Sequence, residues 1–234
     1  MQQLAVPPKK SFRLLIVSDH VAPTLFNAEV GKLVGQVDLL LSCGDLPYSY
    51  LEYLVTNLGV RYAFFVHGNH DGVEFCHNGT TLCEPGGWEN VDSRCAHVPP
   101  LDLLVAGMEG SIRYHPRAPY QYTQTQMTWR AQRLILQLLF NRVRYGRYLD
   151  IFIAHSPPAG IHDGPDGPHQ GFGFFLTLMR YFRPRLLLHG HKHRYGPMPW
   201  HTQYYETEVV NVYPFRIIDW HEDQITYGRL YCCC

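Results

Sequence analysis

Short apolar runs and amphipathic stretches alternate along the first third of the chain. Short, mostly apolar runs at 12–17, 37–42 and 60–66 are typical of strands that are buried on both faces. Between them, a moderately apolar stretch at 25–34 and apolar residues spaced three and four apart at 46–58 predict two helices. Strands that alternate with helices in this way indicate right-handed crossover units and a largely parallel sheet.

The middle of the chain has a less regular pattern. The stretch 72–100 is rich in glycine and proline and has few periodic apolar residues, so we expect an irregular insertion near these positions. A strand is predicted at 101–106. A helix should begin at Thr123, because its hydroxyl and Gln126 have the spacing of a capping box and an apolar stripe follows.

The last third of the chain returns to short strands. One apolar run ends at His155, and the proline-rich stretch 156–171 after it is expected to be a loop at the ligand end of the sheet. Two β-branched runs at 209–212 and 216–218 predict antiparallel strands with no helix between them.

Composition and charge narrow the class of protein. The chain has 234 residues, of which 46% are hydrophobic, so we expect a single domain over 1–234 with one sizeable core. Lys plus Arg equals Asp plus Glu at 20 each, which disfavours general nucleic-acid binding. A signal peptide and a run of about eighteen apolar residues are both missing from the sequence, so we expect a cytoplasmic protein without a membrane span.

One segment departs from this neutral balance. Seven arginines and no acidic residue lie between Glu109 and Asp150. A solvated helix face is the favoured interpretation of these arginines, and a surface that steers anions is the alternative.

The seven cysteines do not form a regular disulfide framework. Cys76, Cys83, Cys95 and His97 offer a structural zinc site as one hypothesis, but they lack the tight Cys-x-x-Cys spacing of such sites, so reduced thiols are expected. The triplet at 232–234 is interpreted as a frayed tail rather than a lipidation signal, because Tyr231 stands where a C-terminal prenylation motif needs its cysteine.

Five apolar runs end in side chains that can bind metals. These side chains are Asp19, Asp45, Asn69-His70-Asp71, His155, and His191 with His193. We expect them to converge, because open α/β sheets bind ligands beside the carboxyl ends of their strands. Mixed oxygen and nitrogen ligands suit manganese, iron(II), zinc or nickel, and two such ions can polarise a phosphoryl oxygen and turn a bound water into hydroxide. The alternative is a buried structural histidine cluster; His162 and His169 are further candidates for lining the pocket.

These segments resemble the signature of calcineurin-like metallophosphoesterases. The family pattern runs Asp-x-His, Gly-Asp, Gly-Asn-His-Asp or Glu, a lone His, and Gly-His-x-His. In this chain the corresponding segments are Asp19-His20-Val21, Gly44-Asp45, Gly68-Asn69-His70-Asp71, His155, and Gly190-His191-Lys192-His193. The resemblance spans most of the chain and implies an α/β fold, a four-layered sandwich of two mixed β-sheets flanked by helices.

The resemblance also implies roles for the site residues. Asp45 would bridge two divalent ions, with Asp19 and His193 on one ion and Asn69, His155 and His191 on the other. His70 would contact the phosphate and protonate the leaving oxygen, with Asp71 orienting it. Asn69 and His70 are thus the expected substrate-binding residues, and His70 and Asp71 the expected catalytic residues.

One position departs from the family pattern. Val21 stands where the first motif has a histidine, and it cannot bind a metal. With ordinary pleating, residue 21 shares a face with Asp19 while His20 points away. We therefore expect one tight and one weak site, with manganese the foremost candidate ion.

The leading functional hypothesis is a metal-dependent phosphoesterase that hydrolyses phosphate mono- or diesters through a metal-bound hydroxide. Its substrate is a phosphoester small molecule or a phosphorylated partner, and the sequence does not choose between them. A second hypothesis is an interaction scaffold that keeps this fold but has weak or no turnover, which Val21 favours. A third, a zinc-dependent amide hydrolase, needs a simpler ligand set without a shared carboxylate.

Overall fold

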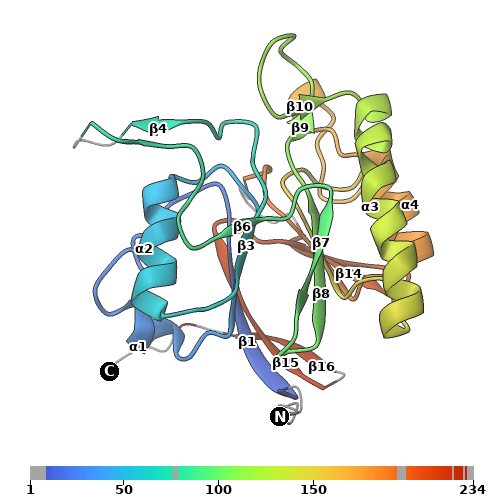
Figure 1. The fold of residues 1–234 in the computed structure, drawn as a ribbon. Helices are drawn as coiled ribbons and strands as arrows, with labels where there is room; N and C mark the ends of the chain where they lie inside the picture. Colours follow the sequence, from blue (N-terminus) through green and yellow to red (C-terminus); the bar gives the residue numbers. More distant parts are fainter. Residues whose placement is uncertain (1–8, 76–78, 194–198, 223, 229, 231–234) are drawn as a thin grey trace.

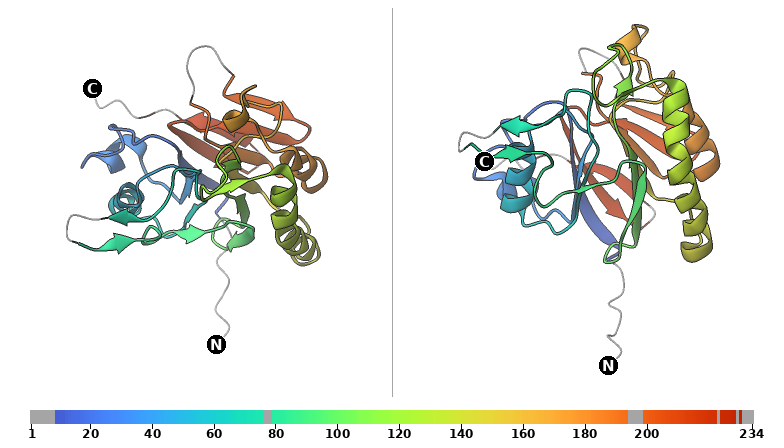
Figure 2. Two further views of the ribbon diagram at one scale, coloured as in Figure 1. Left: turned by 90° about the horizontal axis from the view of Figure 1, so that it is seen from above. Right: turned by 45° about the horizontal axis from the view of Figure 1, so that its top comes forward.

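Two six-stranded mixed sheets face each other in this protein, with helices on their outer sides (Figure 1). The computed structural model describes residues 9–75, 79–193, 199–222, 224–228 and 230. Figure 2 shows the helices near the N-terminus over one sheet and the two later helices over the other. This four-layered α/β sandwich is the fold expected from the sequence.

The first sheet has the strand order β16-β15-β1-β2-β3-β6. Four of its strands run parallel: β1 (Ser11–Val17), β2 (Leu39–Ser42), β3 (Ala63–Phe65) and β6 (Glu89–Asn90). The other two, β15 (Phe215–His221) and β16 (Gln224–Gly228), make it mixed, because β15 lies antiparallel to both β1 and β16.

The second sheet has the order β13-β14-β12-β11-β8-β7. Its parallel strands are β8 (Leu103–Met108), β11 (Ile151–Ala154), β12 (Leu186–His189) and β14 (Thr207–Asn211). The edge strands β7 (Arg94–Val98) and β13 (His201–Tyr204) lie antiparallel to their neighbours. Two small pairs complete the strands, β4 (Glu74–Phe75) with β5 (Thr81–Leu82) and β9 (Ser111–Ile112) with β10 (Gln121–Tyr122).

The helices cover the outer faces of the sheets. The apolar side chains of α1 (Val30–Val34) and α2 (Tyr48–Leu58) pack on the first sheet, and those of α3 (Gln124–Tyr145) and α4 (Gly173–Phe182) pack on the second. A 3₁₀ turn, η1, spans Gly167–His169. No helix among the described residues is long and apolar enough to cross a membrane.

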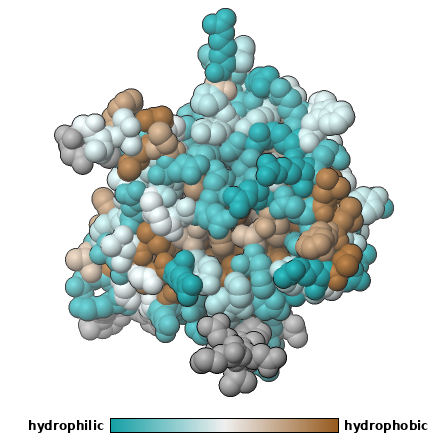
Figure 3. Space-filling view, in the orientation of Figure 1, coloured by the Kyte–Doolittle hydropathy of each residue, from teal (hydrophilic) through white to brown (hydrophobic). Residues whose placement is uncertain are grey.

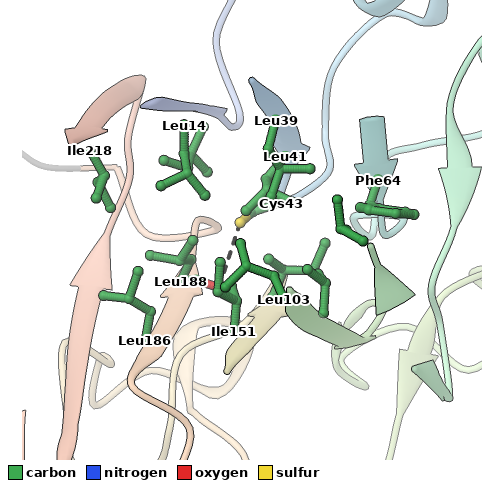
Figure 4. Close-up of a cluster of buried hydrophobic side chains, with 14 of the residues drawn as sticks. Leu14, Leu39, Leu41, Cys43, Phe64, Leu103, Ile151, Leu186, Leu188 and Ile218 are labelled. Atoms are coloured by element: carbon green, nitrogen blue, oxygen red, sulfur yellow. Dashed lines mark hydrogen bonds between the residues drawn. The ribbon is translucent and has the colours of Figure 1, made fainter. Parts of the chain in front are cut away.

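The apolar core occupies the space between the two sheets, and separate clusters lie under the helices. Leu14 and Ile16 of β1 point between the sheets, whereas Leu15 and Val17 point toward α1 and α2. Figure 4 shows the cluster between the sheets, where the Cys43 thiol donates to the Leu188 carbonyl oxygen at 3.5 Å. This alternation explains why the strands appear in the sequence as unbroken apolar runs.

The structure differs from the sequence predictions at several boundaries. Only 30–34 of the stretch 25–34 is helical, and the strand predicted at 60–66 is confined to Ala63–Phe65. The stretch 72–100 is less irregular than expected, because β6 joins the first sheet and β7 the second. The runs at 209–212 and 216–218 are strands, but they lie in different sheets, so the chain crosses between sheets there. The helix α4 was not predicted, although Phe174, Phe175, Leu178 and Met179 have helical spacing.

Candidate metal centre

The turns after β1, β2, β3, β11 and β12 meet at one end of the two sheets. Backbone hydrogen bonds tie them together: Asp19 N–H donates to the Gly44 carbonyl at 3.1 Å, and Gly190 N–H donates to the His155 carbonyl at 3.0 Å. The turns approach so closely that a Cβ at Gly190 would lie 1.8 Å from Ser18 Oγ. The glycine of the Gly-His-x-His segment is therefore required by contact with the turn that carries Asp19.

Three of the candidate ligands have left-handed backbone conformations. The φ angles of Asp19, Asp45 and His191 are 63°, 56° and 62°. Residues other than glycine pay a conformational cost in this region, and such residues gather at functional sites. These turns redirect the side chains away from the pleated alternation of the strands and toward a common point.

His155 lies at the centre of this convergence and is fully buried. Its Nδ1–H donates to the Cys43 carbonyl at 2.7 Å, which leaves the Nε2 lone pair facing the site. Nε2 lies 3.3 Å from Asp45 Oδ2, 3.0 Å from Asn69 Oδ1 and 3.1 Å from His191 Nδ1. An imidazole that is oriented by a backbone carbonyl on its far side is typical of histidines that bind metals.

His191 is oriented in the same way. Its Nε2–H donates to the Pro168 carbonyl at 2.7 Å, so its Nδ1 lone pair faces Nε2 of His155. Ligand atoms of Asp45, His155 and His191 lie within 4.8 Å of one another, and Asn69 Oδ1 adds an amide oxygen. One carboxylate, one amide oxygen and two imidazole nitrogens fit a borderline divalent ion. The residues present therefore suit the metal that the sequence predicts.

The pKa values of Asp45, His155 and His191 show where positive charge is needed in this cluster when no metal ion is bound. Burial by itself would raise the pKa of Asp45, but the charge and hydrogen bond of His155 outweigh burial and lower it to about 2. Burial would lower the pKa of His155, but the carboxylates of Asp45 and Asp19 raise it to about 9. Burial and the charge on His155 lower the pKa of His191 to about 3. In the metal-free protein a proton on His155 thus supplies the positive charge.

Asp19 and His193 form a looser pair beside this cluster. The Asp19 side chain is 2% exposed, and burial raises its pKa. Its carboxylate oxygens accept the His191 N–H at 2.9 and 3.0 Å. His193 is 42% exposed, stacks on Tyr213 and has Nε2 4.0 Å from Asp19 Oδ1. This second position therefore brings fewer donors together than the first.

Val21 does not have the orientation that ordinary pleating predicts. The strand β1 ends at Val17, and Asp19 already turns left-handed, so the alternation of faces does not extend to residue 21. Val21 is partly buried and packs against the apolar cluster under α1 and α2. His20 is exposed, and its ring centroid lies 6.4 Å from that of Tyr213. The expectation that residue 21 shares the metal-facing side of Asp19 is corrected.

His70 and Asp71 have different environments. The His70 backbone N–H donates to Asp45 Oδ1 at 2.8 Å, and the exposed His70 lines the cavity at the site. The Asp71 carboxylate accepts backbone N–H bonds from Asp45 at 3.1 Å, Leu46 at 3.2 Å and Gly68 at 2.8 Å. Asp71 therefore clamps the turns after β2 and β3, which places the His70 backbone.

The cavity at the site has a volume of about 430 Å³. Its lining consists of Asp19, Asp45, His70, His169, His191, Lys192 and His193. His169 thus has the position suggested by the sequence. His162 does not line this cavity; it is buried, with Nδ1 2.9 Å from His189 Nε2 and Nε2 2.8 Å from Thr202 Oγ1.

Several residues that support the site were not predicted. Tyr114 Oη accepts the Asn69 amide at 3.1 Å, and the Cys43 and Pro168 carbonyls orient the two histidines. Any residue type can provide a carbonyl, so the sequence carries no signal for these contacts. Lys192 lies inside the recognised Gly-His-x-His segment. Its side chain donates to the Asp163 carbonyl at 2.7 Å and so joins the turn after β12 to the loop at 156–171.

The proposed cysteine site receives no support from the described residues. Cys95 packs in the cluster under α3 and accepts from the Asn141 amide, while Cys83 is exposed. Among the described residues, the group that could hold a metal is the one formed by Asp45, His155 and His191. Cys76 and the triplet 232–234 lie outside the described residues.

Comparison with solved structures supports the fold. TT1561 of Thermus thermophilus superposes with a TM-score of 0.58 at 17% identity, covering 93% of this chain and 98% of that one. GAP50 of Plasmodium, described as the anchor in the inner membrane complex, gives a TM-score of 0.53 at 13% identity, covering 94% of this chain and 84% of that one. At these identities the likeness concerns the fold alone.

Comparison of the sequence itself identifies the family. A search among curated proteins finds no match. The sequence model described as calcineurin-like phosphoesterase matches residues 12–195, which cover β1 through the turn that carries His191 and His193. The chain belongs to the calcineurin-like phosphoesterase family.

Proposed function

We propose that this chain is a metal-dependent phosphoester hydrolase whose tight metal position is formed by Asp45, Asn69, His155 and His191. The observation that carries the proposal is the convergence of His155 Nε2 and His191 Nδ1 at 3.1 Å, with both far nitrogens bonded to backbone carbonyls. Two imidazole lone pairs aimed at one point beside a carboxylate need a cation between them. Members of the family use divalent metals, in agreement with this donor set.

The second, weaker metal position would lie between Asp19 and His193, with Asp45 shared. Asp45 suits a shared role because its Oδ2 lies 3.3 Å from His155 Nε2 and its side chain lines the same cavity as Asp19 and His193. When bound, a divalent metal polarises a phosphoryl oxygen and lowers the pKa of a water molecule. Manganese is the first candidate ion, with iron(II), zinc or nickel as alternatives.

His70 is proposed to protonate the leaving oxygen. It lines the 430 Å³ cavity beside Lys192 and His169, whose positive or protonatable groups suit the phosphate, and it also lines a neighbouring cavity of about 460 Å³. Asp45 and His70 are shared by both cavities, so a phosphate at the metals would place its leaving group in the second one. His70 is then within reach of the oxygen that departs.

The second cavity suggests the character of the leaving group. Its lining comprises Asp45, Leu46, Pro47, Tyr48, His70, Asp71, Gly72, Val73 and Glu74. Its described lining combines apolar and acidic side chains with His70 and includes neither Lys nor Arg. A leaving alcohol that is uncharged or positively charged therefore fits it better than one that carries a further phosphate or carboxylate.

The function is tested by metal analysis combined with hydrolysis assays. Purified protein is stripped with chelator, titrated with manganese, and assayed on phosphomonoesters and diesters whose leaving alcohols are apolar, cationic or anionic. We expect loss of hydrolysis on stripping, recovery with manganese, and preference for the apolar and cationic alcohols. Activity that persists after complete stripping contradicts metal dependence, and a preference for anionic alcohols contradicts the proposed leaving-group cavity alone.

One observation favours a second candidate function, a scaffold with weak or no turnover. The position of the usual first-motif histidine is occupied by Val21, whose partly buried side chain packs against the apolar cluster under α1 and α2. The same assays separate the two candidates: metal binding without hydrolysis of any phosphoester favours the scaffold.

A further inference from the structure

The outer face of α3 carries a stripe of large apolar side chains that the fold leaves exposed. Trp129, Leu136, Phe140 and Val143 are 73%, 69%, 61% and 85% exposed. Figure 3 shows the resulting hydrophobic patch on the right of the molecule, where Figure 1 places α3. The opposite face of the helix is buried against the second sheet through Met127, Ala131, Leu134 and Leu138. The stripe therefore adds nothing to the core of this chain.

The spacing of the stripe is that of a helix–helix seam. Trp129, Leu136 and Val143 are seven residues apart, and Leu139, 48% exposed, follows Leu136 by three. This is the pattern by which one helix packs along another with a repeat of about 3.5 residues. At 3.6 residues per turn, Trp129, Leu136, Phe140 and Val143 fall within an arc of roughly 60°. Such a narrow stripe suits a partner helix better than a bilayer, which takes up a broad apolar face.

The charges around the stripe define the chemistry of that helix. α3 contains four arginines and no acidic residue. Arg130 is already paired with Asp92 and Glu109. Arg133 and Arg144 are exposed and lie along the same edge of the stripe by helical spacing. A second copy of this chain would bring the same arginines together without carboxylates from α3, so complementarity favours an acidic partner.

We propose that the outer face of α3 docks an amphipathic helix of another protein, with apolar residues along the stripe and carboxylates beside Arg133 and Arg144. Aromatic anchors such as Trp129 and Phe140 are the residues that contribute most in interfaces of this kind. This docking surface is separate from the metal centre, and its use does not depend on hydrolysis.

The test uses two synthetic helical peptides with leucine at the seam positions. One carries glutamate at the flanking positions and the other lysine. Binding to the full chain is followed by Trp129 fluorescence and by calorimetry at low and high salt. We expect the glutamate peptide to bind at least about tenfold more tightly at low salt, with the difference shrinking as salt screens exposed charges.

Variants assign this binding to the stripe. Leu136→Gln with Phe140→Gln should abolish binding of both peptides, whereas Arg133→Glu with Arg144→Glu should reverse the preference in favour of the lysine peptide. Tyr205→Gln, which changes an exposed aromatic residue outside α3, is the matched control and should bind as the parent does. The thermal unfolding midpoint of each variant confirms that it is folded.

Three results overturn the proposal. The first is equal affinity for the two peptides. The second is a dimer of the parent chain in sedimentation that is lost in Leu136→Gln with Phe140→Gln, which assigns the stripe to a second copy. The third is flotation of the full chain with phosphatidylserine vesicles while the two peptides bind equally. That result assigns the stripe to a membrane surface.

Discussion

The Nε2 atom of His155 lies 3.1 Å from the Nδ1 atom of His191, and the other nitrogen of each ring donates to a backbone carbonyl. This arrangement fixes the tautomers of both rings when they are neutral, so that two lone pairs face each other. A proton or a metal ion must lie between them. Asp45 completes the cluster from the first sheet, while both histidines follow strands of the second. The centre therefore joins the two halves of the sandwich.

Asp45→Asn tests whether this carboxylate belongs to the centre. The substitution removes the negative charge next to His155 while keeping the shape of the side chain, so metal affinity should fall sharply and hydrolysis with it. Metal content is measured by mass spectrometry of purified protein at fixed free manganese. Asp38→Asn, a change to a carboxylate that pairs with Lys9, is the control and should keep its metal. Full metal content in Asp45→Asn would exclude Asp45 as a shared ligand.

His70→Ala tests the proposed role in protonating the leaving oxygen. General acid catalysis contributes on the order of a hundred- to ten-thousand-fold, so turnover should fall by that order while metal content stays nearly unchanged. The loss should be smaller for substrates whose leaving alcohol is already acidic, because they need less proton transfer. His97→Ala on β7 is the control. An equal loss for good and poor leaving groups would leave His70 only a role in binding phosphate.

The sequence predicted which residues converge at the metal centre, but it did not predict the conformation of the turns that orient their side chains. Unbroken apolar runs that end in Asp19, Asp45, Asn69, His155 and His191 were enough to place those residues at one end of the sheets. The turn geometry was not predictable, because Asp19 is left-handed and its turn lies in close contact with the turn at Gly190, which is far away in the sequence. The error over Val21 follows from that missing contact.

The fold shows a similar division between local and long-range information. The capping box of Thr123 and Gln126 correctly marks the start of α3, because it depends on neighbouring residues alone. The sequence predicts an antiparallel strand at 216–218, but the place of β15 beside β1 depends on residues far apart in sequence and was not predictable from the local pattern. The exposed stripe on α3 was not predicted, because the sequence was interpreted as one apolar stripe with a solvated face that carries the arginines.

The pH dependence of stability tests the His155–Asp45 pair. The pKa of His155 is raised to about 9 in the folded chain, so its stabilisation is complete below its ordinary pKa and is lost as pH rises to 9. The pKa of Asp45 is lowered to about 2, so the ionised carboxylate stabilises the fold at any pH above the ordinary pKa of an aspartate. This stabilisation is lost only as the pH falls to about 2. Three buried histidines act in the opposite direction, because their pKa values are lowered to about 4 (His162), 3 (His189) and 3 (His191). Their own contribution to stability therefore rises with pH up to about 6.5.

The metal-free protein should therefore lose on the order of 3 kcal/mol between pH 6.5 and pH 9 through His155, since one pKa unit corresponds to about 1.4 kcal/mol. Urea unfolding with chelator present measures this loss. Saturating manganese should abolish it, because metal replaces the proton on His155, and His155→Gln should abolish it without metal. An unchanged decline in His155→Gln would assign the loss to other groups.

Val21→His tests whether residue 21 faces the metal, as ordinary pleating predicts, or packs under α1 and α2, as the structure has it. If residue 21 faced the metal with Asp19, a histidine there would add a ligand and reduce the manganese needed for half-maximal activity. In the structure Val21 packs against the apolar cluster under α1 and α2. We expect an unchanged manganese requirement and a free energy of unfolding lower by about 1–3 kcal/mol, because the imidazole loses its water against apolar side chains. Val21→Ala is the control, since it loses the same contacts without adding a ligand. A manganese requirement that falls in Val21→His but not in Val21→Ala would mean that the turn at Asp19 can rearrange to bring residue 21 to the metal.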